Sequence, residues 1–319
     1  MLVTQRNSLG EVNIIESYFT IIKRTDSNYL EIANEWLRIP VNNEEWVTLF
    51  ERIGSTLVDD KGNKFSLRSG RTLVLREPGN NELEDSIREH IIGWYFSETD
   101  LQAARLPYFI PQHPANVPLL EGDFSNLSAF LYALYHLQRS DFDAIVEALN
   151  RSIELPNSIK IKHDGTRGGQ NARYSFVEKA FGEERFIPPE SMSDGTISLL
   201  GHLALFLADR SITLACLEEP NNGLHPRIMI HLVDAMRQAI NRERIDKAGH
   251  KVTPQIIATT HSPEFMDCFD LTQEADYLQV YIVERNELGQ TIFTPATADE
   301  FAPWLEKYHL GEAVRRRFI

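Results

Sequence analysis

The sequence predicts an α/β protein with a parallel-sheet lobe, an antiparallel β-rich lobe and a helical insert. Short apolar runs separated by polar turn clusters occupy about residues 18–74, which is typical of antiparallel strands. Helical periodicity follows, and after Pro188 apolar strands alternate with helices. We therefore predict a β-rich lobe over residues 1–95, a helical and hairpin insert over 96–180, and a C-terminal lobe over 181–319.

Composition indicates a globular protein and excludes several classes. With 319 residues and 42% hydrophobic content, the chain can bury a large core. The formal charge of -14 argues against a free-standing duplex binder, because nonspecific DNA affinity comes mainly from Lys and Arg. Cys216 and Cys268 follow no disulfide or metal spacing, so we expect two buried thiols in a reducing cytoplasm. No apolar run approaches the roughly 20 residues of a membrane span.

The middle of the chain is predicted to form helices followed by a hairpin. Helical periodicity covers about residues 82–95 and 127–153, and Ser140 is placed to cap a helix within the second stretch. The runs SIKIK at 158–162 and ARYSFVE at 172–178 flank a turn-rich segment, which predicts a hairpin.

The C-terminal lobe has the alternating pattern of a β-α-β unit. Residues 193–207 are apolar on nearly every side, which predicts a buried helix, and the strand SITLACLEEP follows at 211–220. A helix is expected over about residues 226–244 and a second buried strand over 255–262. A hairpin over 277–293 and a terminal helix complete the chain.

The first candidate site lies where the buried helix begins. Ser193, Asp194 and Gly195 form a short polar step before the apolar helix. Free backbone N–H groups, a hydroxyl and the positive helix end suit an anion such as a γ-phosphate. The alternative is an ordinary helix cap, which by itself is the commoner use of such residues.

The second candidate is a pair of carboxylates at the end of an apolar strand. Glu218 and Glu219 follow TLACL directly, so they lie at the carboxyl edge of a parallel sheet, where open α/β folds bind ligands. Because neighbouring residues on a strand diverge, one carboxylate can serve Mg²⁺ and the other an attacking water. The alternative is two solvated charges at a helix start, which the apolar run and Pro220 disfavour.

The third candidate is His261, which follows the next buried strand. Parallel topology brings the end of that strand beside Glu218 and Glu219. A histidine there can hydrogen-bond a terminal phosphate or its attacking water. A lone histidine is more often structural. The functional interpretation of His261 therefore depends on the order of all three segments.

The segments SMSDGT, EEPNNGLHP and THSP, in this order, resemble the ABC-type ATPases of the SMC/RecF-like branch. The likeness is greatest to bacterial "predicted ATPase" proteins of the AAA family, which are related to the ATPase half of OLD-family proteins. It extends from about residue 123 to the C-terminus. It implies a P-loop NTPase-like fold, ATP and Mg²⁺ as ligands, and a dimer.

The resemblance also implies roles for individual residues. Residues 191–196 correspond to the signature loop, in which Ser193, Asp194 and Gly195 face the γ-phosphate bound by the opposite subunit. Glu218 holds Mg²⁺, usually through water, and Glu219 polarises the attacking water. The remaining assignments are the D-loop from Asn222 to His225 and the switch histidine His261.

One part of the family pattern is missing. No G-x-x-x-x-G-K-[ST] motif occurs, although this P-loop normally supplies an amide cradle and a phosphate-binding lysine. The sequence opens in the segment that follows the P-loop in the family. A truncated gene or a misplaced start is the first explanation, and a divergent subunit that donates only its signature face is the second.

The leading functional hypothesis is an ATP-binding and ATP-hydrolysing dimeric switch in DNA-related or phage-defence processes, incomplete as written. The alternative is a non-hydrolysing accessory subunit in a heterodimer with a P-loop-bearing ATPase. DNA or a separate effector, such as a nuclease or toxin, is the expected partner. The stretch after His261 is too short for the Toprim nuclease of OLD-type relatives.

Overall fold

The computed structural model describes the chain as two compact units, Met1–Glu89 and His90–Ile319. The predicted boundaries at 95 and 180 remain predictions. The described residues are 2–6, 12–24, 30–40, 46–53, 56–59, 61–66, 91–97, 101–110, 114–153, 158–166, 169–180, 183–209, 211–242, 244–245, 251–274, 276–296 and 310–315.

The first unit contains an antiparallel sheet in which the strand order follows the sequence order. Each strand pairs with the next, so the sheet is a meander, and the predicted antiparallel strands are confirmed as far as Ser66. Residues 67–74 of that prediction lie outside the described residues. The strands are β1 (Leu2–Arg6), β2 (Val12–Arg24), β3 (Leu30–Pro40), β4 (Trp46–Ile53), β5 (Thr56–Asp59) and β6 (Lys64–Ser66).

The second unit is built around a parallel sheet, which confirms the predicted α/β class. The described strands run in the order β15 (Gln255–Thr259), β12 (Leu214–Glu218) and β7 (Trp94–Phe96). The helix predicted over 82–95 is wrong at its end, because residues 94 and 95 pair with β12 as a strand. Residues 82–90 of it lie outside the described residues.

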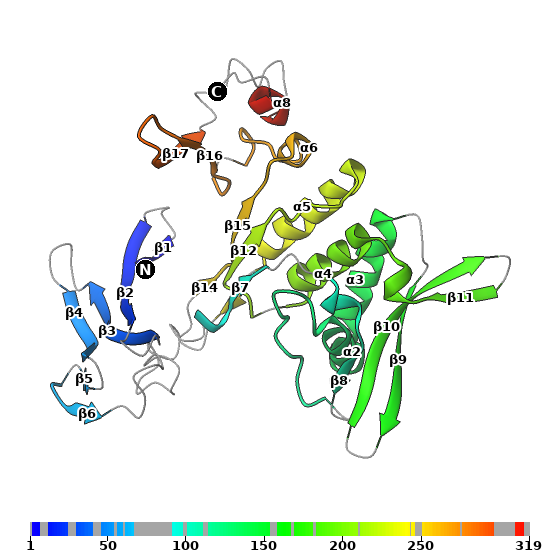
Figure 1. Ribbon diagram of the computed structural model, residues 1–319, viewed down its shortest axis with the longest axis horizontal. Helices are drawn as coiled ribbons and strands as arrows, with labels where there is room; N and C mark the ends of the chain where they lie inside the picture. The colour runs from blue at the N-terminus through cyan, green and yellow to red at the C-terminus, as the bar shows by residue number, and fades with distance from the viewer. Residues whose placement is uncertain are drawn as a thin grey trace. The chain divides into compact units, whose positions relative to one another are not determined.

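Two helices cover one face of this sheet (Figure 1). They are α4 (Asp194–Leu207) and α5 (Pro226–Ile240), and α5 ends four residues before the predicted boundary. Within β12 the buried residues Ala215 and Leu217 alternate with the half-buried Leu214 and Cys216. One face of the strand therefore packs against the core more closely than the other.

Two expectations of burial were wrong. Strand β15 is largely exposed, with Ile257 50% accessible, because in the described sheet it pairs only with β12. Cys216 and Cys268 are free and half-buried. Partial burial still raises the pKa of both thiols.

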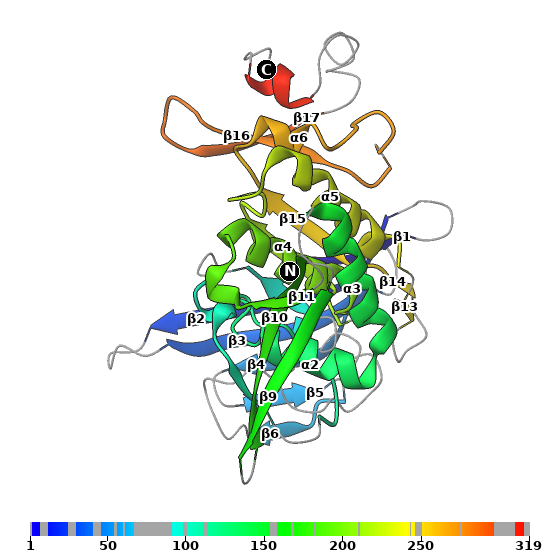
Figure 2. The ribbon, with the colours of Figure 1, turned by 90° about the vertical axis from the view of Figure 1, so that its right-hand side faces the viewer.

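The insert packs helices against a second, antiparallel sheet. Its helices are α2 (Leu127–Leu137) and α3 (Arg139–Ser152), as the periodicity predicted. Ser140 is not the N-cap of α3, because the helix begins at Arg139 and Gln138 occupies the cap position, two residues before Ser140. Strands β9 (Ser158–Thr166) and β10 (Gly169–Ala180) form the predicted hairpin, a long antiparallel ribbon in Figure 2. Strands β8 (Tyr108–Ile110) and β11 (Glu183–Ile187) also pair with β10.

Short elements connect and finish the second unit. They are η2 (Ala103–Arg105), η3 (Pro189–Ser191), β13 (Arg244–Ile245), β14 (Lys251–Val252), α6 (Pro263–Met266), β16 (Val280–Arg285), β17 (Thr291–Ala296) and α8 (Leu310–Arg315). The predicted C-terminal hairpin is β16–β17, and the predicted terminal helix is α8. Within the described part of the chain, no helix is long and apolar enough to cross a membrane.

Helix α8 packs closely against α6. The backbone N–H of Gly311 donates to the Asp267 carboxylate at 2.7 Å. A Cβ added at Gly311 would lie 1.9 Å from the carbonyl oxygen of Pro263. Only a glycine permits this backbone approach.

Candidate active site at the carboxyl edge of the parallel sheet

The ends of the three parallel strands meet at one edge of the sheet. Glu218 is in register with Thr259 of β15, and its backbone N–H donates to the hydroxyl of Ser97, which follows β7, at 2.9 Å. The Glu218 side chain is exposed at this edge. Ser97 was not predicted as a site residue, although its place directly after the apolar run WYF was a usable signal.

Glu219 and His261 are brought together, as the topology predicted. The backbone N–H of Glu219 donates to the Thr259 carbonyl at 3.1 Å, which fixes one loop on the other. The His261 N–H lies 3.4 Å from Oε2 of Glu219, and its ring Nε2 lies 3.6 Å from Oε1. The imidazole is 98% exposed, whereas the carboxylate is 24% exposed.

The backbone of Glu219 adopts a strained conformation. Its φ of 46° lies in the left-handed region, which residues other than glycine seldom adopt. Strain of this kind concentrates at functional sites, where the surrounding structure enforces it. Here the enforcing contacts are the bond to Thr259 and a bond from the Asn222 N–H to the Glu219 carbonyl at 2.8 Å.

A second contact locks the same two loops together. The hydroxyl of Thr260 donates to Oδ1 of Asn221 at 2.8 Å and accepts from the Ser262 N–H at 3.0 Å. Asn221 is 7% exposed, so this bond is shielded from water. No sequence pattern predicts this pairing, because the partners are 39 positions apart.

The predicted D-loop residues Asn222 and His225 lie in the turn between β12 and α5. Both side chains are exposed, and Nδ1 of His225 accepts from the Arg227 N–H at 3.2 Å as the N-cap of α5. Gly223 has a φ of 73°, which lets the chain turn between them.

The Ser193 loop, residues 189–196, lies against this turn. Ser193 is the N-cap of α4, and its hydroxyl oxygen accepts from the Thr196 N–H at 3.1 Å. A Cβ added at Gly195 would lie 2.2 Å from the carbonyl oxygen of Gly223. The helix start and the turn after Glu219 are therefore in direct backbone contact. The cap interpretation of Ser193 is correct, and a role towards phosphate stays a prediction.

A buried arginine holds the Ser193 loop and was missed by sequence reasoning. Arg105 donates from Nη1 to the carbonyl oxygens of Pro189 at 2.6 Å and Met192 at 2.9 Å, and its Nη2 pairs with Asp194. Asp194 is therefore engaged inside its own chain. No local pattern marks a partner more than 80 positions away.

The oxygen donors at the sheet edge suit a Mg²⁺ ion coordinated partly by water and phosphate better than a metal held by protein ligands alone. No group of three or more His, Cys, Asp or Glu side chains converges among the residues that the structure describes. Mg²⁺ prefers one or two carboxylates, with water and phosphate oxygens completing its shell. The exposed Glu218 carboxylate at the strand end can supply such a ligand.

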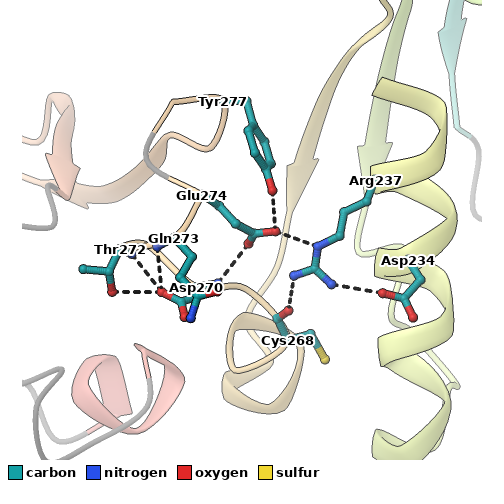
Figure 3. A network of polar contacts seen from close by, with 8 residues as sticks. All are labelled: Asp234, Arg237, Cys268, Asp270, Thr272, Gln273, Glu274 and Tyr277. Carbon is teal, nitrogen blue, oxygen red and sulfur yellow. Dashed lines mark hydrogen bonds and ion pairs between the residues drawn. The ribbon is translucent and has the colours of Figure 1, made fainter. Parts of the chain in front are cut away.

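A charged network behind the site ties the segment that follows His261 to α5 (Figure 3). Arg237 of α5 donates to Glu274 at 2.6 Å and to the Cys268 carbonyl at 2.8 Å. Burial opposes ionisation of Glu274, but hydrogen bonds from Arg237, the Asp270 N–H and Tyr277 hold its pKa below the usual range. The network joins the helix after Glu219 to the segment after His261.

Comparison with known families assigns the greater part of the chain. Residues 74–267 match the family described as "AAA domain, putative AbiEii toxin, Type IV TA system". The chain belongs to this family. Membership of this AAA-domain family supports a nucleotide-binding function of the ATPase type. The matched region includes Ser193, Glu219 and His261.

Solved structures with similarity to the chain include SMC head domains. One is an Smc head bound to the C-winged helix domain of ScpA, at 11% identity and a TM-score of 0.41, covering 85% of this chain and 76% of that chain. Another is the SMC head domain from Thermotoga maritima, at 11% identity and a TM-score of 0.34, covering 83% and 74%. No curated protein matches the sequence.

Proposed function

We propose that this chain is an ATPase subunit of the SMC/RecF-like branch that acts as a dimeric nucleotide switch. The observation that carries the proposal is the juxtaposition of Glu219 and His261 at the carboxyl edge of the parallel sheet. A partly shielded carboxylate beside an exposed imidazole provides two groups suited to phosphoryl transfer to water. We also propose that the chain is related to the ATPase half of OLD-family proteins.

The two residues have complementary roles in the proposed reaction. The Glu219 carboxylate accepts a hydrogen bond from the attacking water and aligns it with the terminal phosphate. His261, whose ring is almost fully exposed, donates to a terminal phosphate oxygen. Glu218 provides the Mg²⁺ ligand. Bound Mg²⁺ supplies neutralisation of the phosphate charge.

The Ser193 loop completes a neighbouring site in the proposed head-to-tail dimer. Ser193 is exposed at the start of a 14-residue helix, so its side chain is accessible to a second subunit. The positive end of a helix favours a phosphate placed there. Each composite site then combines the Glu219 edge of one chain with the Ser193 loop of the other.

The missing P-loop limits what this chain does alone. Without the lysine and amide cradle, ATP loses most of its anchoring. The second candidate, an accessory subunit, is favoured by one observation: the Ser193 loop is capped and braced by residues of its own chain. We propose that DNA or a separate effector protein responds to the nucleotide-dependent change of the dimer.

The proposal is tested by mixing two inactive variants. Ser193→Arg and Glu219→Gln are each introduced into a chain with a restored P-loop. In the mixed dimer one site carries both defects and the other carries neither, so partial ATPase activity returns. Heterodimers are verified by size and by two tags. If they stay as inactive as either parent, the shared-site mechanism is wrong. If the unrestored chain activates a P-loop-bearing subunit, the accessory role is established.

A further inference from the structure

The Ser193 loop is braced by one buried side chain from a distant part of the sequence. Arg105 is 8% exposed, and three of its N–H groups are directed to acceptors between Pro189 and Asp194. The arginine is itself fixed, because the buried hydroxyl of Tyr174 donates to the carbonyl of the neighbouring Ala104 at 2.9 Å. The brace therefore connects η2 and β10 to the loop that begins α4.

Removal of Arg105 would leave this part of the loop without three hydrogen bonds from a buried cation. The Pro189 carbonyl would lose a buried bond, and the Met192 carbonyl lies directly before the Ser193 cap. Bonds to charged groups contribute more than neutral ones, and an unsatisfied buried acceptor is costly. The position of the Ser193 hydroxyl thus depends on the guanidinium.

The same side chain alters the charge of the loop. Asp194, in the first turn of α4, would oppose an incoming phosphate, but it pairs with Arg105. The other carboxylate of the loop, Glu190, pairs with Arg173. With both carboxylates paired, the partial positive charge of the helix start is less opposed by the loop's own carboxylates.

We infer that Arg105 is a positioning residue, which holds the Ser193 loop in its phosphate-ready shape and offsets the charge of Asp194. It acts through the loop and does not touch nucleotide. This inference rests on the proposed function of the Ser193 loop.

The structural part is tested on the 319-residue chain by amide hydrogen exchange. Arg105→Met keeps the apolar stem and removes the donors, Arg105→Lys keeps the charge, and Arg139→Met is the control that breaks an exposed Arg–Asp pair. We expect the amides of Thr196 and Ile197 to exchange about tenfold faster in Arg105→Met. Arg105→Lys should recover part of this protection, and Arg139→Met should leave it unchanged. Exchange in α5 should stay constant.

Two exchange results would overturn the inference. The first is unchanged exchange at Thr196 and Ile197 in Arg105→Met. The second is a uniform increase that includes α5, because this would reveal general destabilisation and no local positioning.

The functional part uses mixed dimers of the P-loop-restored chain. Arg105→Met should regain activity when mixed with Glu219→Gln but none when mixed with Ser193→Arg, because Arg105→Met and Ser193→Arg both impair the Ser193 loop. If Ser193→Arg and Glu219→Gln do not rescue each other, the proposed function is wrong. The hydrogen-exchange result still tells whether Arg105 positions the Ser193 loop. If the two variants do rescue each other, and Arg105→Met also rescues Ser193→Arg, the positioning role is wrong while the proposed function stands.

Discussion

Nε2 of His261 lies 3.6 Å from Oε1 of Glu219, although the two residues follow different strands and are 42 positions apart. The parallel pairing of β12 with β15 produces this contact by placing Glu218 opposite Thr259. The next residues of both loops then meet above the sheet edge. The chemistry proposed for the chain depends on this arrangement.

The 319-residue chain by itself should hydrolyse ATP negligibly. Its sheet edge offers Glu218, Glu219 and His261 but no P-loop lysine or amide cradle for the β- and γ-phosphates. Phosphate release and calorimetric titration with MgATP measure this directly. Micromolar affinity together with steady turnover would contradict the prediction.

Glu219→Gln should trap a nucleotide-bound dimer in a P-loop-restored chain. The amide keeps the shape of the side chain but removes the carboxylate that aligns water, so turnover should collapse while assembly persists. Size-exclusion chromatography with ATP, beside a phosphate-release assay, gives both readings. Glu287→Gln, in the turn between β16 and β17, is the control. If Glu219→Gln hydrolyses ATP at the parental rate, Glu219 is not the residue that aligns the attacking water.

Gly195→Ala should destabilise the contact between the Ser193 loop and the turn after Glu219. Its Cβ would lie 2.2 Å from the Gly223 carbonyl oxygen, so a backbone must move. Overpacking of this kind costs about 1–3 kcal/mol. Urea unfolding measures the loss, and Ser191→Ala, an exposed position in the same loop, should remain within about 0.5 kcal/mol of the parent. Equal stability of both variants would show that the loop moves freely.

His202→Leu should reduce the acid sensitivity of the fold. Burial lowers the pKa of His202 to about 4, and its Nε2 has no partner within the described part of the chain. The unfolded chain takes up a proton near pH 6.5 and the folded chain only near pH 4, so stability falls as pH drops through this window. The loss should be on the order of 3 kcal/mol. Urea midpoints at pH 7 and pH 4.5 test it, and equal pH slopes for variant and parent would contradict it.

Local patterns predicted the elements well because their causes are local. The alternation along ARYSFVE and the all-round apolar helix after Ser193 each follow from the residues themselves. Two apolar strands, each followed closely by a polar functional residue, were enough to predict that Glu219 lies near His261, since parallel topology leaves little choice.

Interactions between distant segments could not be predicted in this way. The brace from Arg105 and the bond between Thr260 and Asn221 depend on tertiary packing that no spacing encodes. Ser140 had the right residue type for a cap, but the actual cap position, Gln138, lies two residues earlier. Burial of β15 was overestimated because its apolar sequence does not reveal how many neighbours the strand has.

The close packing of Gly311 against Pro263 has a consequence for labelling this protein. Helix α8 ends the described chain, yet its first turn touches the helix that starts two residues after His261. A group attached directly after Arg315 would therefore be connected through α8 to the helix that follows the histidine loop. A reporter placed after Arg315 could register movement of that loop.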